Sequence, residues 1–205
     1  MVREVRIHVE GGGNGPEGKD QLRRGFGQFF GTLYDAARSK RVKIRTIACG
    51  SRGATFDRFS QALIDYPQSF NVLLVDSEEP VNKGRREHLI ARDGWPLGGT
   101  PEEKCHLMVQ VMETWLIADT DALRRFYGQG FNANPIPNPA NLESVDKSRV
   151  LAALREATRK TQKGEYGKIK HGSGLLAVAS SEVVRQHLEH CREFFVAIES
   201  AISGP

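Results

Sequence analysis

Residues 71–79 read NVLLVDSEE, and this segment is the clearest indication of the fold class. Its four consecutive apolar residues predict a strand that is buried on both faces, as in a parallel sheet covered by helices. Two carboxylates, Asp76 and Glu78, follow the run directly. An earlier run, RIHVEGGG at residues 6–13, reaches a carboxylate in the same way at Glu10. Because parallel strands deliver their last residues to one edge of a sheet, we expect these acids to meet there as a divalent-metal site.

The segments around these runs predict a doubly wound α/β domain. Residues 3–9 and 42–48 are typical of strands, and an apolar stripe at helical spacing lies between them. A second helix is expected to begin at the capping residue Ser51 and to stop before Pro67. Strands that alternate with helices in this way form parallel sheets. The first stripe consists of Leu22, Phe26, Phe29, Phe30, Leu33 and Ala37.

Residues 105–119 are strongly apolar and favour a fourth strand, over 105–110, that leads into a helix; a single buried helix is the alternative. Residues 82–100 are polar and rich in glycine and arginine, which predicts a long functional loop.

The prolines and asparagines of residues 132–141 indicate an irregular connector. Residues 164–174 indicate a basic, glycine-containing loop. One closing helix is expected to begin at Ser180 or Ser181 and to carry Val184, Leu188, Cys191, Phe195, Ile198 and Ile202 on its apolar face.

Composition favours one compact unit. The 205 residues are 39% hydrophobic and 26% charged, which suits a core domain over residues 1–130, with the connector, basic loop and C-terminal helix of residues 131–205 packed on it. No apolar run approaches the roughly 20 residues that span a bilayer, so we expect a cytoplasmic protein without a membrane partner. The three cysteines lack metal-ligand spacing and are expected to be buried thiols: Cys49, Cys105 and Cys191.

Charge points to a polyanionic partner. The net charge is only +4, but six basic residues fall within a short stretch, residues 155–170, that holds only two acids. Such a stretch beside an acidic metal site fits a nucleic acid, and a solvated helix face is the structural alternative. In this region Lys168, Lys170 and His171 are expected to contact phosphate from the glycine-flanked loop.

The carboxylates Glu10, Asp76 and Glu78 have the chemistry of a Mg²⁺ or Mn²⁺ site. Mg²⁺ takes one or two protein carboxylates and fills its other positions with water and phosphate oxygens. In an Asp-x-Glu at a strand end, alternation places both side chains on one side of the sheet. Glu10 can bind the ion or move a proton. Capping or solvated acids at strand ends are the structural alternative.

A second pattern overlaps the first. Residues 13–20 read GNGPEGKD and match the phosphate-loop pattern G-x-x-x-x-G-K-[ST] except at Asp20. In that interpretation Lys19 would contact the phosphates of a nucleotide. Glu10 and Glu17 would oppose a triphosphate unless a metal neutralised them.

Three motifs in this order resemble a bacterial family of unknown function with a TOPRIM-like domain: Val9-Glu10-Gly11, Asp76-x-Glu78 and the segment HLMVQVMETWLIAD at residues 106–119. TOPRIM is the metal-binding catalytic domain of topoisomerases, bacterial primases and the overcoming-lysogenization-defect nucleases. The resemblance implies a Rossmann-like, four-stranded parallel core with Glu10 as general acid/base and the third-strand acids as Mg²⁺ ligands. The usual second acid is Asp, so the longer Glu78 implies a shifted ion. Similar members look like partners of AAA- or ABC-type ATPases in anti-phage defence.

Glu113 is a further catalytic candidate. A carboxylate among aliphatic residues costs several kcal/mol unless it binds a cation, pairs or protonates. If the fourth strand ends near residue 110, Glu113 lies in the first turn of the next helix, at the active edge of the sheet. An ion pair with an arginine is the structural alternative.

Together these patterns predict a nuclease that uses Mg²⁺ or Mn²⁺ to hydrolyse phosphodiester bonds in DNA or RNA. A phosphate-loop nucleotidase is one alternative. A non-catalytic, TOPRIM-like binding subunit of an ATPase complex is the other.

Overall fold

A four-stranded parallel sheet forms the centre of the protein, as the sequence predicts. The computed structural model describes residues 2–13 and 15–204. The strands lie side by side in the order β2-β1-β3-β4, and every neighbouring pair is parallel. All four therefore point their carboxyl ends toward one edge. Their bounds are Glu4–Glu10 (β1), Lys43–Gly50 (β2), Phe70–Asp76 (β3) and Cys105–Met108 (β4).

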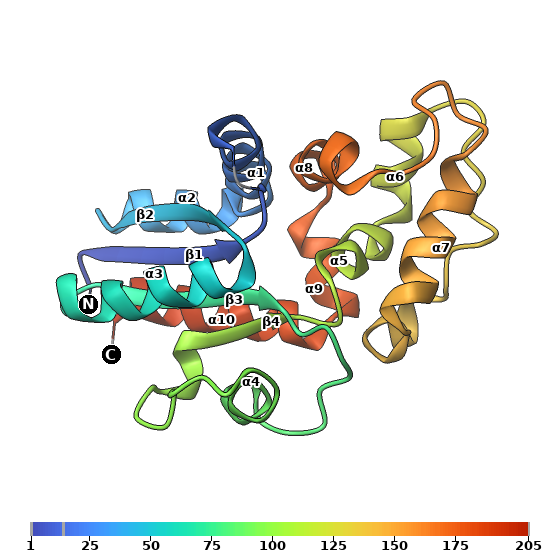
Figure 1. Cartoon of the computed structure of the whole chain (residues 1–205). Helices are drawn as coiled ribbons and strands as arrows, with labels where there is room; N and C mark the ends of the chain where they lie inside the picture. Colours follow the sequence, from blue (N-terminus) through green and yellow to red (C-terminus); the bar gives the residue numbers. More distant parts are fainter. Residues whose placement is uncertain (1, 14, 205) are drawn as a thin grey trace.

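Helices cover both faces of the sheet (Figure 1). Helices α3 (Arg52–Asp65) and α4 (Arg85–Asp93) pack on the face that presents Leu73 and Val75. Helices α1 (Pro16–Phe29), α2 (Gly31–Ser39) and α10 (Glu189–Ser203) cover the opposite face, where Val72 and Leu74 join a larger core. The unbroken apolar run of β3 is explained by this burial on both faces.

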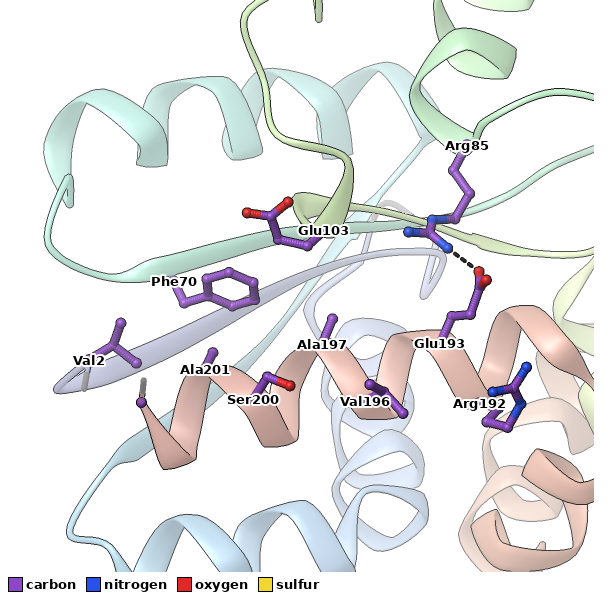
Figure 2. Close-up of a pocket in the computed structure, with 11 residues that line it drawn as sticks. Val2, Phe70, Arg85, Glu103, Arg192, Glu193, Val196, Ala197, Ser200 and Ala201 are labelled. Carbon is purple, nitrogen blue, oxygen red and sulfur yellow. Dashed lines mark hydrogen bonds and ion pairs between the residues drawn. The ribbon is translucent and has the colours of Figure 1, made fainter.

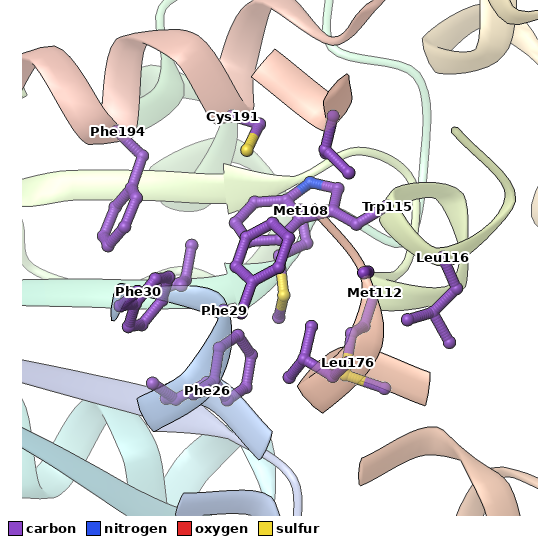
Figure 3. Close-up of a cluster of buried hydrophobic side chains, with 14 of the residues drawn as sticks. Phe26, Phe29, Phe30, Met108, Met112, Trp115, Leu116, Leu176, Cys191 and Phe194 are labelled. Atoms are coloured by element: carbon purple, nitrogen blue, oxygen red, sulfur yellow. The ribbon is translucent and has the colours of Figure 1, made fainter. Parts of the chain in front are cut away.

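A group of short helices lies beyond the carboxyl ends of the strands (Figure 1). It comprises α5 (Met112–Ala118), α6 (Thr120–Tyr127), α7 (Lys147–Thr158), α8 (Lys168–Val178) and α9 (Ser181–His187), with a 3₁₀ turn at Pro139–Ser144. Another 3₁₀ turn, Glu102–Lys104, directly precedes β4 at the opposite end of the sheet. Figure 3 shows how this group shares its core with the sheet, because Trp115 of α5 lies among phenylalanines of α1 and α10. The indole stacks on Phe29 with ring centroids 5.4 Å apart. The carboxyl edge is thus enclosed between the sheet and the helical group.

Several boundaries agree with the sequence analysis. Ser51 caps α3 by accepting a hydrogen bond from the Ala54 amide, and α3 ends two residues before Pro67. The 105–119 segment is a strand followed by a helix, and Ser180 caps α9. All three cysteines are buried and free.

Both long apolar stripes are interrupted, which corrects two predicted single helices. The first divides into α1 and α2 at Phe30, and the closing stripe divides into α9 and α10 at Leu188, which has extended dihedral angles. Phe30 and Leu188 are themselves buried. Apolar periodicity continues across each interruption because both helices of each pair face the same core, so the periodicity does not reveal the break.

Two predicted loops contain helices. Within residues 82–100, α4 begins after Gly84 and ends at Gly94, which has φ +67° and forms a left-handed cap. Within residues 164–174, helix α8 begins at Lys168. Its internal Gly174 leaves room for a neighbour, since a Cβ there would lie 3.1 Å from the ring of Phe126. Glycine marks helix ends in the first case and close packing in the second.

Within residues 2–13 and 15–204, no helix combines the length and apolarity needed to cross a bilayer.

Candidate active site

Three carboxylates meet at the carboxyl edge of the sheet. Glu10 ends β1, Asp76 ends the neighbouring β3, and Glu78 follows two residues later. One oxygen from each lies within 4.8 Å of the others. Strand alternation does not place Glu78 there, because β3 has already ended and Glu78 has φ +65°. This left-handed conformation, unusual for a residue other than glycine, directs the third carboxylate toward the other two.

Asp76 is the most enclosed of the three acids, with 4% of its surface exposed. Its Oδ1 accepts a 2.7 Å hydrogen bond from the Met112 amide at the start of α5. Its Oδ2 lies 3.3 Å from the ammonium nitrogen of Lys168. Burial raises the pKa of Asp76 to about 7; the charge of Lys168 opposes this effect, while nearby Glu10 and Glu113 add to it. The carboxyl group is therefore held in a position where its charge is costly.

Glu10 is held by an arginine that the sequence analysis did not single out. Its Oε2 accepts hydrogen bonds from Nη1 of Arg52 and from the Asp76 amide, both at 3.2 Å. Burial raises the pKa of Glu10, and the Arg52 charge opposes that rise. Arg52 follows the Ser51 cap at the end of β2, so parallel topology brings it to the same edge. The position of Arg52 directly after a predicted strand was the feature of the sequence that could have indicated its contact with Glu10.

Arg52 is itself fixed from α4. Its guanidinium donates two hydrogen bonds of 2.8 Å to Asp93, in a bidentate pair, and a third to the backbone carbonyl of Asp76. It also lies over Trp95, 5.1 Å from the ring centroid, and Trp95 stacks on Phe56. Part of the 82–100 segment, predicted as a functional loop, thus supports the acids from outside the cavity.

Glu113 lies in the first turn of α5, where the sequence analysis expected it, and is fully buried. Its Oε1 accepts a 2.8 Å hydrogen bond from the hydroxyl of Tyr166. Its Oε2 accepts no hydrogen bond within the described part of the chain and faces the Lys168 ammonium at 3.5 Å. Burial and the charge of Glu113 raise the pKa of Tyr166, which keeps its hydroxyl proton available for this bond. The cation beside Glu113 is a lysine and not an arginine.

Lys147, at the start of α7, forms an ion pair with Glu78. No motif marked this lysine in the sequence. Its amide nitrogen also lies 3.3 Å from Oε1 of Gln110, in the turn between β4 and α5. The helical group beyond the sheet therefore supplies two cations to the acids, one from α7 and one from α8.

A cavity of about 380 Å³ opens on the glycine side of the acids. Its walls include the backbone of Gly11, Gly12 and Gly13, all with positive φ. Side chains of Leu22 and Ile169 make part of the lining apolar. A second hollow of about 290 Å³ lies on the α7 side and is lined by Lys147, Arg155 and Tyr166 among others. Asp76 and Lys168 line both, so the acids lie between a largely apolar cavity and a hollow where acids and cations meet.

The three residues expected to contact nucleic acid lie in different environments. Lys168 reaches the acids, and its pKa is raised by Asp76 and Glu113 against the effect of burial. Lys170 is exposed, and its ammonium donates to the Lys163 carbonyl. His171 is buried, 3% exposed, and its Nδ1 accepts from the Gly167 amide. The prediction that His171 lies in a loop was wrong, because it belongs to helix α8, which turns its side chain into the core.

Lys19 of the phosphate-loop pattern does not line the cavity beside the acids. It lines another hollow, at the outer edge of β2, together with Arg23, Arg45 and Arg58. Gly12 and Gly18 instead bring the loop against the start of α1, because a Cβ on Gly18 would lie 2.4 Å from the Gly12 carbonyl oxygen. Gly12 and Gly18 therefore allow two backbone segments to pack closely against each other.

A groove of about 620 Å³ lies at the other end of the sheet, between α10 and the starts of the strands (Figure 2). Val196 and Ala197 of α10 form part of one wall and Phe70 of β3 part of another. Arg85 and Glu193 pair across its rim. The groove contains no group of three or more clustered acids, cysteines or histidines among the described residues. It is an apolar surface with a charged rim.

Neither the curated proteins nor the solved structures include a match to this chain. A family model does match, over residues 9–199, and that span contains every acid and every cation of the site described above. It is described as a domain of unknown function, DUF4276. The chain therefore belongs to the DUF4276 family of unknown function.

Proposed function

We propose that this protein hydrolyses phosphodiester bonds in a nucleic acid with the help of Mg²⁺ or Mn²⁺. The observation that carries the proposal is the convergence of Glu10, Asp76 and Glu78, whose oxygens lie within 4.8 Å of one another. They lie at the carboxyl edge of a parallel sheet, where open α/β sheets bind their ligands. The resemblance to TOPRIM-like nucleases, which rests on the same acids, supports the same chemistry.

The donor set suits a hard divalent ion. All three groups are carboxylates, and Mg²⁺ and Mn²⁺ prefer oxygen ligands. The pKa values of Glu10 and Asp76 are raised, so the site gains from a cation that replaces the proton. When bound, such an ion polarises the phosphate and lowers the pKa of an attacking water.

The remaining roles belong to side chains of this chain. Glu10 accepts the proton of the attacking water, and Arg52 holds its carboxylate in place through Nη1. Lys168 directs positive charge toward the phosphate from the start of α8. Arg155 and Lys147 line the hollow on the α7 side, where they pair with Glu165 and Glu78, and both can also face the neighbouring phosphate of a strand.

A nicking assay without ATP tests this proposal. Wild type is expected to cleave nucleic acid with Mg²⁺ or Mn²⁺ and to lose activity with a chelator. Asp76→Ala should lose both the cleavage and most of the Mn²⁺ affinity measured by calorimetry, while remaining folded. Equal Mn²⁺ affinity in the two proteins would rule out the site assignment.

The groove along α10 favours a second candidate, a binding subunit of an AAA- or ABC-type ATPase complex. Val196 on its wall is 50% exposed, and exposed apolar patches with polar rims commonly mark protein contacts. Co-purification with such an ATPase, together with no cleavage by the isolated chain, would favour this role. Anti-phage defence is the setting that the TOPRIM-like resemblance suggests for either role, in the cytoplasm.

A further inference from the structure

We propose that Lys168 acts as a built-in cation that makes this a one-ion site. Its ammonium group occupies the position between Asp76 and Glu113 that a second divalent ion would otherwise fill. The inference rests on the proposed function, because it concerns the ions that the same acids bind. It assigns to Lys168 the control of how many ions enter.

The contacts of Lys168 resemble those expected of a bound cation. Its Nζ lies 3.3 Å from Asp76 Oδ2 and 3.5 Å from Glu113 Oε2. Both carboxylates are almost fully buried, with side-chain exposures of 5% and 1%. In two-metal sites, ions about 3.5–4 Å apart share such acidic ligands. In this protein the other oxygen of Asp76, Oδ1, accepts a hydrogen bond from the Met112 amide.

Glu113 provides an independent indication. Its Oε2 accepts no hydrogen bond among the described residues, although the side chain is buried. A buried carboxylate oxygen without a donor is costly unless a cation faces it. Lys168 is the cation that lies there, and without it this oxygen is free to bind a metal.

The charges around the cavity agree with a single ion. Five carboxylates face four cations through the ion pairs at this edge, which leaves a formal charge of one negative unit. One divalent ion already exceeds this charge, and a second would add two more positive charges to an enclosed site. The acids are Glu10, Asp76, Glu78, Asp93 and Glu113, and the cations are Arg52, Arg92, Lys147 and Lys168.

Close packing of two helices sets the backbone of Lys168 at this edge of the sheet. Helix α8 begins at Lys168, and its Ser173 lies against Gly25 of α1. A Cβ on Gly25 would lie 2.6 Å from the Ser173 carbonyl oxygen, so α8 can lie this close to α1 only because residue 25 has no side chain. The first turn of α8 is thereby set beside the ends of β1 and β3.

Counting bound Mn²⁺ tests the inference. Calorimetric titration at pH 8 should give one ion per chain for wild type and two for Lys168→Met, which keeps the length of the stem but removes the charge. Electron paramagnetic resonance should show coupling between two neighbouring Mn²⁺ ions only in Lys168→Met. Lys168→Arg, which keeps the charge, should bind one ion. Lys170→Met is the matched control, because that ammonium contacts a backbone carbonyl and no acid; it should bind one ion.

Each outcome decides a separate point. Two ions in wild type, or one ion in a folded Lys168→Met, would overturn the role of Lys168. One ion in wild type and two in Lys168→Met, without any nicking by wild type, would keep the role of Lys168 and refute the nuclease function. No ion in any of the four proteins would remove the metal site and this inference together.

Discussion

The two ends of the sheet carry cavities of opposite chemistry. At the carboxyl end, Asp76 and Glu113 are buried beside Lys168, and their charges depend on one another. At the amino end, the groove along α10 has apolar walls, and its ion pair between Arg85 and Glu193 lies at the rim. Buried acids are costly unless cations face them. Buried acids with raised pKa values are common at functional sites. The cavity at the carboxyl end is therefore the stronger candidate for catalysis.

The largest expected effect is on catalysis at the carboxyl end. Glu10→Gln keeps the shape of the side chain but removes the charge that accepts a proton and binds the ion. We expect nicking activity to fall by about 10²–10⁴-fold. Rates measured with Mg²⁺ and with Mn²⁺ at matched folding, verified by circular dichroism, check this prediction.

Lys19→Ala is the contrasting variant, because the phosphate-loop alternative makes Lys19 essential. The Lys19 side chain does not line the cavity beside the acids. The nicking activity of Lys19→Ala should therefore stay within about tenfold of wild type. Three results together would favour a nucleotidase over a nuclease. Wild type would bind ATP, Lys19→Ala would not bind it, and Glu10→Gln would stay active.

Stability should distinguish the two faces of α10. Phe195 is fully buried and packs edge-to-face on Phe29 and Phe30, with centroids 6.0 Å and 5.9 Å away. Phe195→Ala should lower the free energy of unfolding by about 3–5 kcal/mol through the cavity that it leaves. Its neighbour Val196 faces the groove, and Val196→Ala should cost less than about 1 kcal/mol. Urea denaturation measures the free energy of unfolding of both variants. Similar losses of stability in Phe195→Ala and Val196→Ala would contradict this prediction.

The pH dependence of stability should reveal the cost of the buried acid. The folded pKa of Asp76 is raised to about 7 from its ordinary 3.8, so the folded state holds this proton more tightly than the unfolded chain does. That contribution is fully present below pH 4 and is lost as the pH rises through 7. Asp76→Asn avoids the loss and should become more stable than wild type above pH 7, by at most about 4 kcal/mol.

Denaturation of both proteins between pH 4 and pH 8 checks this prediction, since the difference should vanish near pH 4. Mg²⁺ at pH 8 should stabilise wild type more than Asp76→Asn. A difference that does not change with pH would show that Asp76 is not the titrating group.

A smaller effect on stability is expected at the helix contact that places Lys168. Gly25→Ala places a Cβ against the Ser173 carbonyl and should cost about 1–3 kcal/mol, with a parallel loss of activity as α8 moves away. Gly27→Ala is the matched control in the same helix, because no neighbouring atom lies within 4 Å of its Cβ. It should stabilise by about 0.5–1 kcal/mol. Thermal unfolding and nicking rates of the pair test the contact, and equal behaviour would contradict it.

The sequence was sufficient to predict the sheet and two of its acids. Apolar runs that end on Glu10 and Asp76 belong to the strands themselves, and parallel topology brings strand ends together. The sequence could not reveal why Glu78 joins them, since Glu78 adopts a left-handed conformation in which its amide donates to the distant Gln110 carbonyl. The same holds for His171, whose burial follows from a helix that the glycine content concealed.

The sequence by itself determined the class of fold and the residue types at the carboxyl edge, because both depend on local periodicity and on chain order. Tertiary structure alone decided which cations meet those acids. Arg52, Lys147 and Lys168 come from three different helices and are separated from Asp76 by 24 to 92 positions. Their meeting depends on how closely α7 and α8 pack against the sheet, and the close packing of α8 is possible because Gly25 has no side chain. Such contacts are set by distances between helices, which no local pattern in the sequence encodes.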